Sequence, residues 1–167
     1  NDAPTVVNDT DSVTEGGTVT NTTNVGTGTV VSDDSDEEGN TLSVSGTVTH
    51  TASDGSSVSG GNSDTAGSSS SIEGTYGTLT LDTDGSYSYV ATTSSANALG
   101  ASETGTDTFT FLVSDGTTTT SSTIIFTVNG VNDAPVSSAS SVTTNEDTTH
   151  TFTADDFNFS DVDGDTL

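Results

Sequence analysis

Residues 74–89 read G-T-Y-G-T-L-T-L-D-T-D-G-S-Y-S-Y, and this stretch decides the fold class. Apolar and polar residues alternate on both sides of residues 82–85, which is the pattern of two half-buried strands. The Asp-Thr-Asp-Gly segment between them favours a hairpin turn in which the glycine adopts a positive φ. The sequence therefore predicts adjacent strands over residues 77–81 and 86–90.

The same alternation recurs along the chain and extends this hairpin into an all-β fold. Further strands are predicted over residues 5–7, 18–21, 27–31, 42–49, 108–114 and 122–129. Residues 53–71 are rich in Gly and Ser and predict a long loop, while residues 96–99 suit one helical turn. Short strands at this spacing indicate a β-sandwich. The expected core consists of Tyr76, Leu79, Leu81, Tyr87, Tyr89, Phe109, Phe111, Val113, Ile125 and Val128.

The charge of the chain is one-sided, with 25 Asp and Glu, no Lys or Arg, and a formal net charge of −25. Each carboxylate must therefore be hydrated, bonded to backbone N–H groups, or bound to a cation. Nucleic acid is excluded as a partner and an anionic membrane surface is a poor one, because both need basic patches. Low hydrophobicity with high charge is also typical of disorder, against which the clustered alternation favours an ordered chain.

The sequence lacks the residues that several classes of function require. The chain has no Cys, which excludes disulfides and thiolate metal sites. No apolar stretch approaches the length of a membrane span, so direct membrane insertion is not expected. His50 and His150 belong to no ligand pattern, and no nucleophile or phosphate-binding motif occurs. We expect no enzyme activity.

A long internal repeat organises the chain. The tetrapeptide N-D-A-P occurs at residues 1–4 and again at 132–135, and these copies contain both prolines. Further on, D-S-D at 34–36 corresponds to D-V-D at 161–163. Similarity at a fixed long period indicates a tandem array. The sequence predicts a complete repeat over residues 1–131, followed by a linker and the N-terminal part of the next repeat over 132–167.

An ordered series of motifs resembles the VCBS repeat, a cadherin-like module of large bacterial surface adhesins. The matching segments are V-T-E-G-G, the hairpin quoted above, A-L-G, T-D-T-F-T-F-L-V-S-D-G and G-V-N-D-A-P, which lie at residues 13–17, 74–89, 98–100, 106–116 and 130–135. The resemblance implies a cadherin-like (immunoglobulin-like) Greek-key β-sandwich of about seven strands. It also implies a tandem array outside the cell or on its surface, without catalysis.

Strand direction groups the acidic residues into two clusters, one at each end of the predicted sandwich. The first lies at the junction with the next repeat and consists of Glu15, Glu103, Asp107, Asn132, Asp133, Asp161 and Asp163. The second lies at the N-terminal end and consists of Asn1, Asp2, Asp34, Asp36 and Asp115. Calcium prefers such carboxylate and amide oxygens, so Ca²⁺ is the expected cofactor. Solvated acidic loops and a general halophile-like acidity are the alternatives.

These observations favour a calcium-rigidified extracellular spacer whose partners are the neighbouring repeats of the same chain. In this hypothesis the array projects distal binding domains for cell adhesion or biofilm formation. An alternative is a subunit of an extracellular protein fibre, in which other copies of the chain assemble by strand addition. Glycan binding through residues 53–71 is a weaker third hypothesis, because that segment has no aromatic residue on which a sugar would stack.

Overall fold

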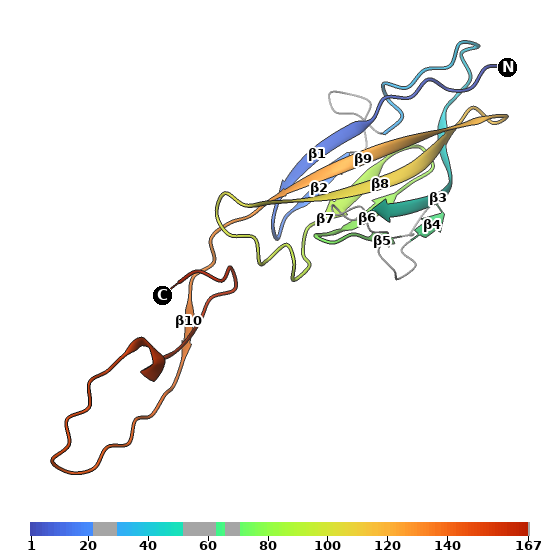
Figure 1. The fold of residues 1–167 in the computed structure, drawn as a ribbon. Helices are drawn as coiled ribbons and strands as arrows, with labels where there is room; N and C mark the ends of the chain where they lie inside the picture. Colours follow the sequence, from blue (N-terminus) through green and yellow to red (C-terminus); the bar gives the residue numbers. More distant parts are fainter. Residues whose placement is uncertain (22–29, 52–62, 66–70, 167) are drawn as a thin grey trace.

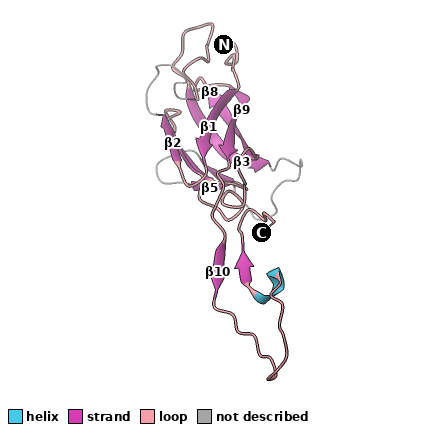
Figure 2. Cartoon of the chain, turned by 90° about the vertical axis from the view of Figure 1, so that its left-hand side faces the viewer, coloured by secondary structure: helices cyan, strands magenta, loops and turns pink. Residues whose placement is uncertain are grey.

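A computed structural model describes residues 1–21, 30–51, 63–65 and 71–166 of the chain (Figure 1). Two β-sheets pack face to face as a sandwich, and a smaller two-stranded sheet lies beyond one end of it (Figures 1 and 2). The predicted all-β sandwich is confirmed. No helix among the described residues is long and apolar enough to cross a membrane.

The first sheet has the strand order β1-β9-β8-β3-β4. Its strands are β1 (Asp9–Thr14), β3 (Ser43–Thr51), β4 (Ser63–Thr65), β8 (Thr104–Ser114) and β9 (Thr119–Asn129). All neighbours in this sheet pair antiparallel except β1 and β9, which pair parallel from Asp9↔Ile124 to Thr14↔Asn129.

The second sheet has the order β2-β7-β6-β5 and is antiparallel throughout. Its strands are β2 (Thr18–Asn21), β5 (Ser71–Glu73), β6 (Thr78–Leu81) and β7 (Tyr87–Val90). The predicted hairpin therefore forms, and Gly85 in its turn has φ +84° as the Asp-Gly signal requires.

Alternate residues of the long strands build the core. In β8 the buried positions run from Gly105 through Asp107 to Val113, and in β9 they include Ile124, Phe126 and Val128. Tyr89 of the second sheet stacks on Phe126 of the first, with ring centroids 4.1 Å apart and planes 3° from parallel. Burial of this apolar core, in which aliphatic side chains surround the aromatic rings, stabilises the sandwich.

The strand directions define two poles. The N-terminal pole holds residues 1–5, 30–42 and 115–118, and the C-terminal pole holds residues 15–17, 91–103 and 130–133. The backbone N–H of Thr5 bonds the carbonyl of Ser35 at the first, and the N–H of Glu15 bonds the carbonyl of Asn129 at the second. The two chain ends of the sandwich therefore leave from opposite poles, and residues 132–166 continue beyond the C-terminal one (Figure 2).

The segment beyond the sandwich contains β10 (Val136–Ser138), the short 3₁₀ helix η1 (Ala154–Asp156) and β11 (Asn158–Ser160). β10 and β11 pair antiparallel, and the chain then returns toward the C-terminal pole (Figure 1). Five of its large apolar side chains are exposed, namely Val136, Phe152, Phe157, Phe159 and Val162.

Several boundary predictions need correction. Residues 5–7 form only an isolated bridge, and the first strand is β1. Two short strands, β4 and β5, interrupt or border the loop predicted at 53–71, while residues 52–62 and 66–70 lie outside the described part of the chain. Of the strand predicted over 27–31, only Val30 and Val31 lie in the described part of the chain, and they belong to a turn. In place of one helical turn at 96–99, residues 94–98 form a hydrogen-bonded turn in which the N–H of Asn97 donates to the carbonyl of Thr93 at 3.1 Å.

The core list needs two corrections as well. Ile125 is only half-buried, because β9 turns Ile124 and Phe126 to the inside and the side chain between them outward. Tyr76 packs against the core but is also only partly buried.

Candidate metal centres at the two poles

The C-terminal pole brings carboxylates of the sandwich against those of the following segment. The N–H of Gly100 donates to Oε2 of Glu103 at 3.1 Å, and the N–H of Asp133 donates to Oδ2 of Asp163 at 2.7 Å. A Cβ placed on Gly100 would lie 3.6 Å from Cβ of Asp163 and 3.8 Å from Oε2 of Glu103. Gly100 therefore lies between the two acids, one from the sandwich and one from the segment that follows it.

Three carboxylate oxygens at this pole are buried and have no hydrogen-bond partner among the described residues. They are Oε2 of Glu15, Oδ2 of Asp133 and Oδ1 of Asp163. A carboxylate oxygen removed from water without a partner is costly, and no Lys or Arg exists in this chain to neutralise it. Oxygen-only donors with net negative charge are the set that a hard divalent cation such as Ca²⁺ prefers, so the residues fit that ion.

The loop of residues 161–165 adds a compact acidic group to this pole. Carboxylate oxygens of Asp161, Asp163 and Asp165 lie within 4.8 Å of one another. Oδ1 of Asp161 accepts bonds from the N–H groups of Asp163 at 3.0 Å and Asp165 at 3.4 Å. Gly164, at φ +77°, permits the turn. Asp165 was not among the predicted ligands, although the Asp-x-Asp-x-Asp spacing was a signal for it.

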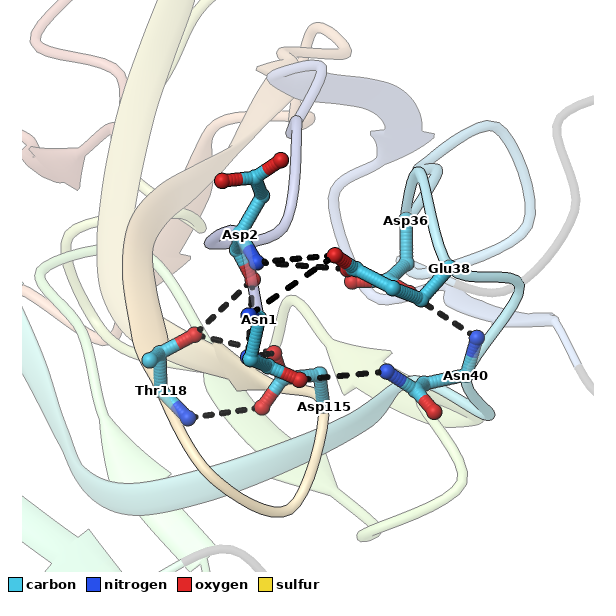
Figure 3. A network of polar contacts seen from close by, with 7 residues as sticks. All are labelled: Asn1, Asp2, Asp36, Glu38, Asn40, Asp115 and Thr118. Carbon is cyan, nitrogen blue, oxygen red and sulfur yellow. Dashed lines mark hydrogen bonds and ion pairs between the residues drawn. The ribbon is translucent and has the colours of Figure 1, made fainter.

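The N-terminal pole is organised around the first two residues (Figure 3). Nδ2 of Asn1 donates to Oδ2 of Asp115 at 2.7 Å, and the N–H of Asp2 bonds both carboxylate oxygens of Glu38 at 3.2 Å. Asn40 donates from Nδ2 to Oδ1 of Asn1 at 3.5 Å. The predicted neighbours Asn1, Asp2 and Asp115 thus lie together, with Asp36 beside them in the same view (Figure 3).

Asp115 differs from the other acids at this pole because its oxygens are already bonded. Hydrogen bonds from the N–H of Thr118, the side chain of Asn1 and the N–H of Thr117 hold the pKa of Asp115 well below its usual range. Its carboxylate therefore stays ionised and orders the turn after β8. It anchors Asn1 more directly than it offers free oxygens to an ion.

A second group at the N-terminal pole has free oxygens. Oδ2 of Asp9, Asp34 and Asp36 is buried in each case without a partner among the described residues. Burial, together with the charges of Asp33 and Asp34, raises the pKa of Asp9 to about 7. Burial likewise raises the pKa of Asp34, partly offset by the bond that its Oδ1 accepts from the N–H of Val7 at 2.8 Å. Crowded, desolvated carboxylates of this kind favour a cation or a proton.

Asp9 was missed because it precedes no turn and lies at the start of β1, where period-2 alternation places it on the inner face with Val13. Asp9, Asp11 and Val13 are alternate residues on one face of β1, but acidic residues are not expected on the inner face of a strand, so the strand was not predicted.

Asp107 was assigned to the wrong place. It was expected in a loop at the C-terminal pole, but β8 begins at Thr104 and carries Asp107 into the core, where it is fully buried. Its carboxylate accepts five bonds of 2.6–3.0 Å, from the N–H groups of residues 75, 76 and 77, the hydroxyl of Tyr89 and Nε2 of His50. With its oxygens so engaged, Asp107 is a structural residue and not a ligand at the junction.

Asn132 is exposed, and its Nδ2 donates to the carbonyl of Asp133 at 2.5 Å. The remaining predicted ligands of that pole, Glu15, Glu103, Asp133, Asp161 and Asp163, lie on the turn, loop and linker that meet there.

The two packed sheets have the architecture of an immunoglobulin-like β-sandwich, and comparison with protein families agrees. The family model of the bacterial cadherin-like domain matches residues 1–130, so the chain belongs to the bacterial cadherin-like domain family. Domains of this family are structural and typically extracellular, and they generally bind Ca²⁺. A search of curated proteins found no match.

Proposed function

We propose that this chain is a calcium-rigidified spacer of the VCBS type within a large extracellular adhesin, where it projects distal binding domains for cell adhesion or biofilm formation. The observation that carries the proposal is the pair of poles with buried carboxylate oxygens that lack a partner among the described residues. Bringing these charges together without a cation is strongly unfavourable. Cation binding and ordering of the junction are therefore one event.

At the C-terminal pole the cation would bridge two units of the chain. Glu15 and Glu103 come from the sandwich, Asp133 from the linker, and Asp161 and Asp163 from the following segment. An ion held by all three would fix the angle between the sandwich and its successor. The restricted φ of Pro135 stiffens the same linker.

The N-terminal pole supports the same assignment for a preceding repeat. The linker residues Asn1 and Asp2 match Asn132 and Asp133 in sequence. In each copy the N–H of the linker Asp donates to a carboxylate of an acidic loop, Asp2 to Glu38 and Asp133 to Asp163. We therefore take residues 1–131 as one repeat and 132–167 as the start of another, with Asp34, Asp36 and Asp9 as ligands facing the previous module.

Calorimetric melting of the full 167-residue chain with calcium and with chelator tests this function. Calcium should raise Tm, and small-angle X-ray scattering should show a narrower distribution of lengths in calcium. The double variant Asp161→Asn, Asp163→Asn should lose the calcium effect on length while keeping its strand content by circular dichroism. An identical Tm with calcium and with chelator would contradict the proposal.

The fibre alternative rests on a different observation, the exposed apolar side chains around the two-stranded β10–β11 sheet. Such a sheet could accept a strand from another copy of the chain. Electron micrographs separate the two functions, because unbranched filaments of uniform width that form without calcium would favour the fibre.

A further inference from the structure

The first eight residues are attached to the sandwich in an unusual way. Hydroxyl groups of β9 and the turn before it lie against main-chain carbonyls of this segment. Thr120 donates to Pro4 at 2.8 Å and Ser122 to Val7 at 3.3 Å, while the hydroxyl of Thr118 is shared between the carbonyl of Asp2 at 3.3 Å and Oδ2 of Asp115 at 2.9 Å. The donors are alternate residues, so they share one face of the strand. We call residues 1–8 the strap.

The strap does not continue the backbone ladder of β1. Ladder pairing of β1 with β9 begins at Asp9↔Ile124, and Pro4 has no N–H with which to extend it. The described backbone-to-backbone bonds of the strap are those between Thr5 and Ser35, at 2.8 and 2.9 Å. Side-chain hydroxyls thus take the place of strand pairing along this part of β9.

The next segment is held differently. β1 and β9 pair in parallel over six consecutive residue pairs. The strap enters β1 from the N-terminal pole, and β9 leaves toward the C-terminal pole (Figure 1). Tension between the ends of the sandwich therefore pulls these neighbouring strands in opposite directions along their length. All six pairs of the backbone ladder then bear the load in shear together, whereas the strap bears it along β9 through separate side-chain bonds, those of Thr120 and Ser122 being 2.8 and 3.3 Å long.

We propose that the repeat bears tension in two stages: the strap is a releasable segment, and the β1–β9 pair is the clamp that holds after it. The inference depends on the proposed spacer function for its biological use, but its geometry does not depend on calcium. Fully extended, eight residues span roughly 26–29 Å at 3.3–3.6 Å per residue. Release under load lengthens the chain by the difference between that span and the length that the strap already occupies along β9. The sandwich itself stays folded, so the strap can rebind when the load falls.

Optical-tweezers measurements in chelator test the clamp. Because the chain has no Cys, a unique handle can be placed at Val131→Cys, which is exposed and excludes the following segment from the load. Pulling between the N-terminus and this handle loads the clamp in shear. Pulling between Thr14→Cys and Val131→Cys opens the same pair from one end. The rupture force in shear should be several-fold higher than the force that opens the pair from one end. Equal forces in the two geometries would contradict the proposal that the β1–β9 pair is a clamp.

The strap is tested by substitution with a matched control. The triple variant Thr118→Val, Thr120→Val, Ser122→Ala removes the three hydroxyl donors, whereas Thr119→Val, Ser121→Ala changes the exposed neighbours on the opposite face of the same segment. The wild type and the control should show a small reversible lengthening before the main rupture. The triple variant should show it at lower force or already released, with the main rupture unchanged.

Hydrogen exchange gives a second readout without force. The amide of Thr5 should exchange faster in the triple variant than in the control. The proposal that the strap is released first is wrong if the wild type shows no step before rupture. It is also wrong if the triple variant matches the control in both measurements. Both experiments are done in chelator, so their failure would leave the calcium function standing, and an absent calcium effect on Tm would leave the clamp standing.

Discussion

The N–H of Asp133 donates a 2.7 Å hydrogen bond to Oδ2 of Asp163, thirty residues further along the chain. This bond joins residue 133 to the acidic loop of residues 161–165, while Oδ1 of Asp163 and Oδ2 of Asp133 are buried without a partner among the described residues. One oxygen of Asp163 is thus satisfied by the backbone, whereas the other oxygen of Asp163 and Oδ2 of Asp133 are the ones that a cation would bind.

Replacing Asp163 by Asn should therefore uncouple calcium from stability at the junction. The amide removes one negative charge and one strong ligand oxygen, so the calcium-induced rise in Tm should shrink relative to the wild type. Differential scanning calorimetry with calcium and with chelator measures this. Asp155→Asn, an exposed acid of the same segment, is the matched control and should keep the full calcium response.

The raised pKa of Asp9 predicts a pH dependence in the calcium-free protein. Its pKa is about 7 in the fold against an ordinary value of 3.8, so the folded state binds the proton more tightly than the unfolded state. Protonation then stabilises the fold, and this contribution is lost as the pH rises through about 7. Melting in chelator between about pH 5 and pH 8 should show Tm falling, and less steeply for Asp9→Asn than for the wild type.

Calcium should reverse that trend, because the ion and the proton compete for the same carboxylates. The apparent calcium affinity, measured by isothermal titration, should weaken as the pH falls below about 7. Glu146→Gln, an exposed acid far from this pole, changes the net charge equally and should leave both pH profiles as in the wild type. A wild-type Tm that rises from pH 5 to 8 in chelator would show that Asp9 is not protonated in this way.

Asp107→Asn should be among the most damaging single substitutions. The amide would place its own NH₂ group among the N–H and O–H donors that now converge on the carboxylate, leaving buried donors unpaired. Breaking a buried charged network in this way costs about 3–5 kcal/mol of unfolding free energy. Urea denaturation measures the loss, with Asp84→Asn in the exposed hairpin turn as a control that should change little.

Gly105→Ala should destabilise the same region through packing. A Cβ at residue 105 would lie 2.5 Å from carbons of the Tyr76 ring, so the ring or β8 must move. Overpacking of a dense interior costs about 1–3 kcal/mol. Thr106→Ala, one residue along on the outward face, provides the comparison, and an equal loss for both variants in urea would contradict the packing argument.

The sequence predicted strands well where apolar and hydroxyl residues alternate. The segment 18–21 forms β2 as predicted, and the hairpin of β6 and β7 differs from its prediction by one residue at the start of each strand. In these segments apolar side chains face the core and polar side chains face water, so the two-residue period alone is sufficient to predict the strand. Strand direction then placed the loops of Glu103 and Asp115 at the correct poles.

The prediction failed where acids lie on the inner face. The strand β1 was not predicted because Asp9 and Asp11 interrupt its apolar pattern. In the structure the carboxylate of Asp11 accepts a 2.7 Å bond from the hydroxyl of Tyr87 across the sandwich. Asp107 was read as the end of a loop for the same reason. Whether an inward acid finds donors depends on residues far away in sequence, such as residues 75–77, and no local pattern contains that information.

The carboxylate of Asp107 also limits how the repeat can evolve. Gly105, Asp107 and Phe109 occupy successive inward positions of β8, so inserting or deleting one residue in this strand would expel the acid to the solvent face and bring threonine in its place. The converging donors would then face a site with no acceptor for them. In homologous domains, insertions and deletions should therefore occur in the loops, while the number of residues between Gly105 and Phe109 should stay constant.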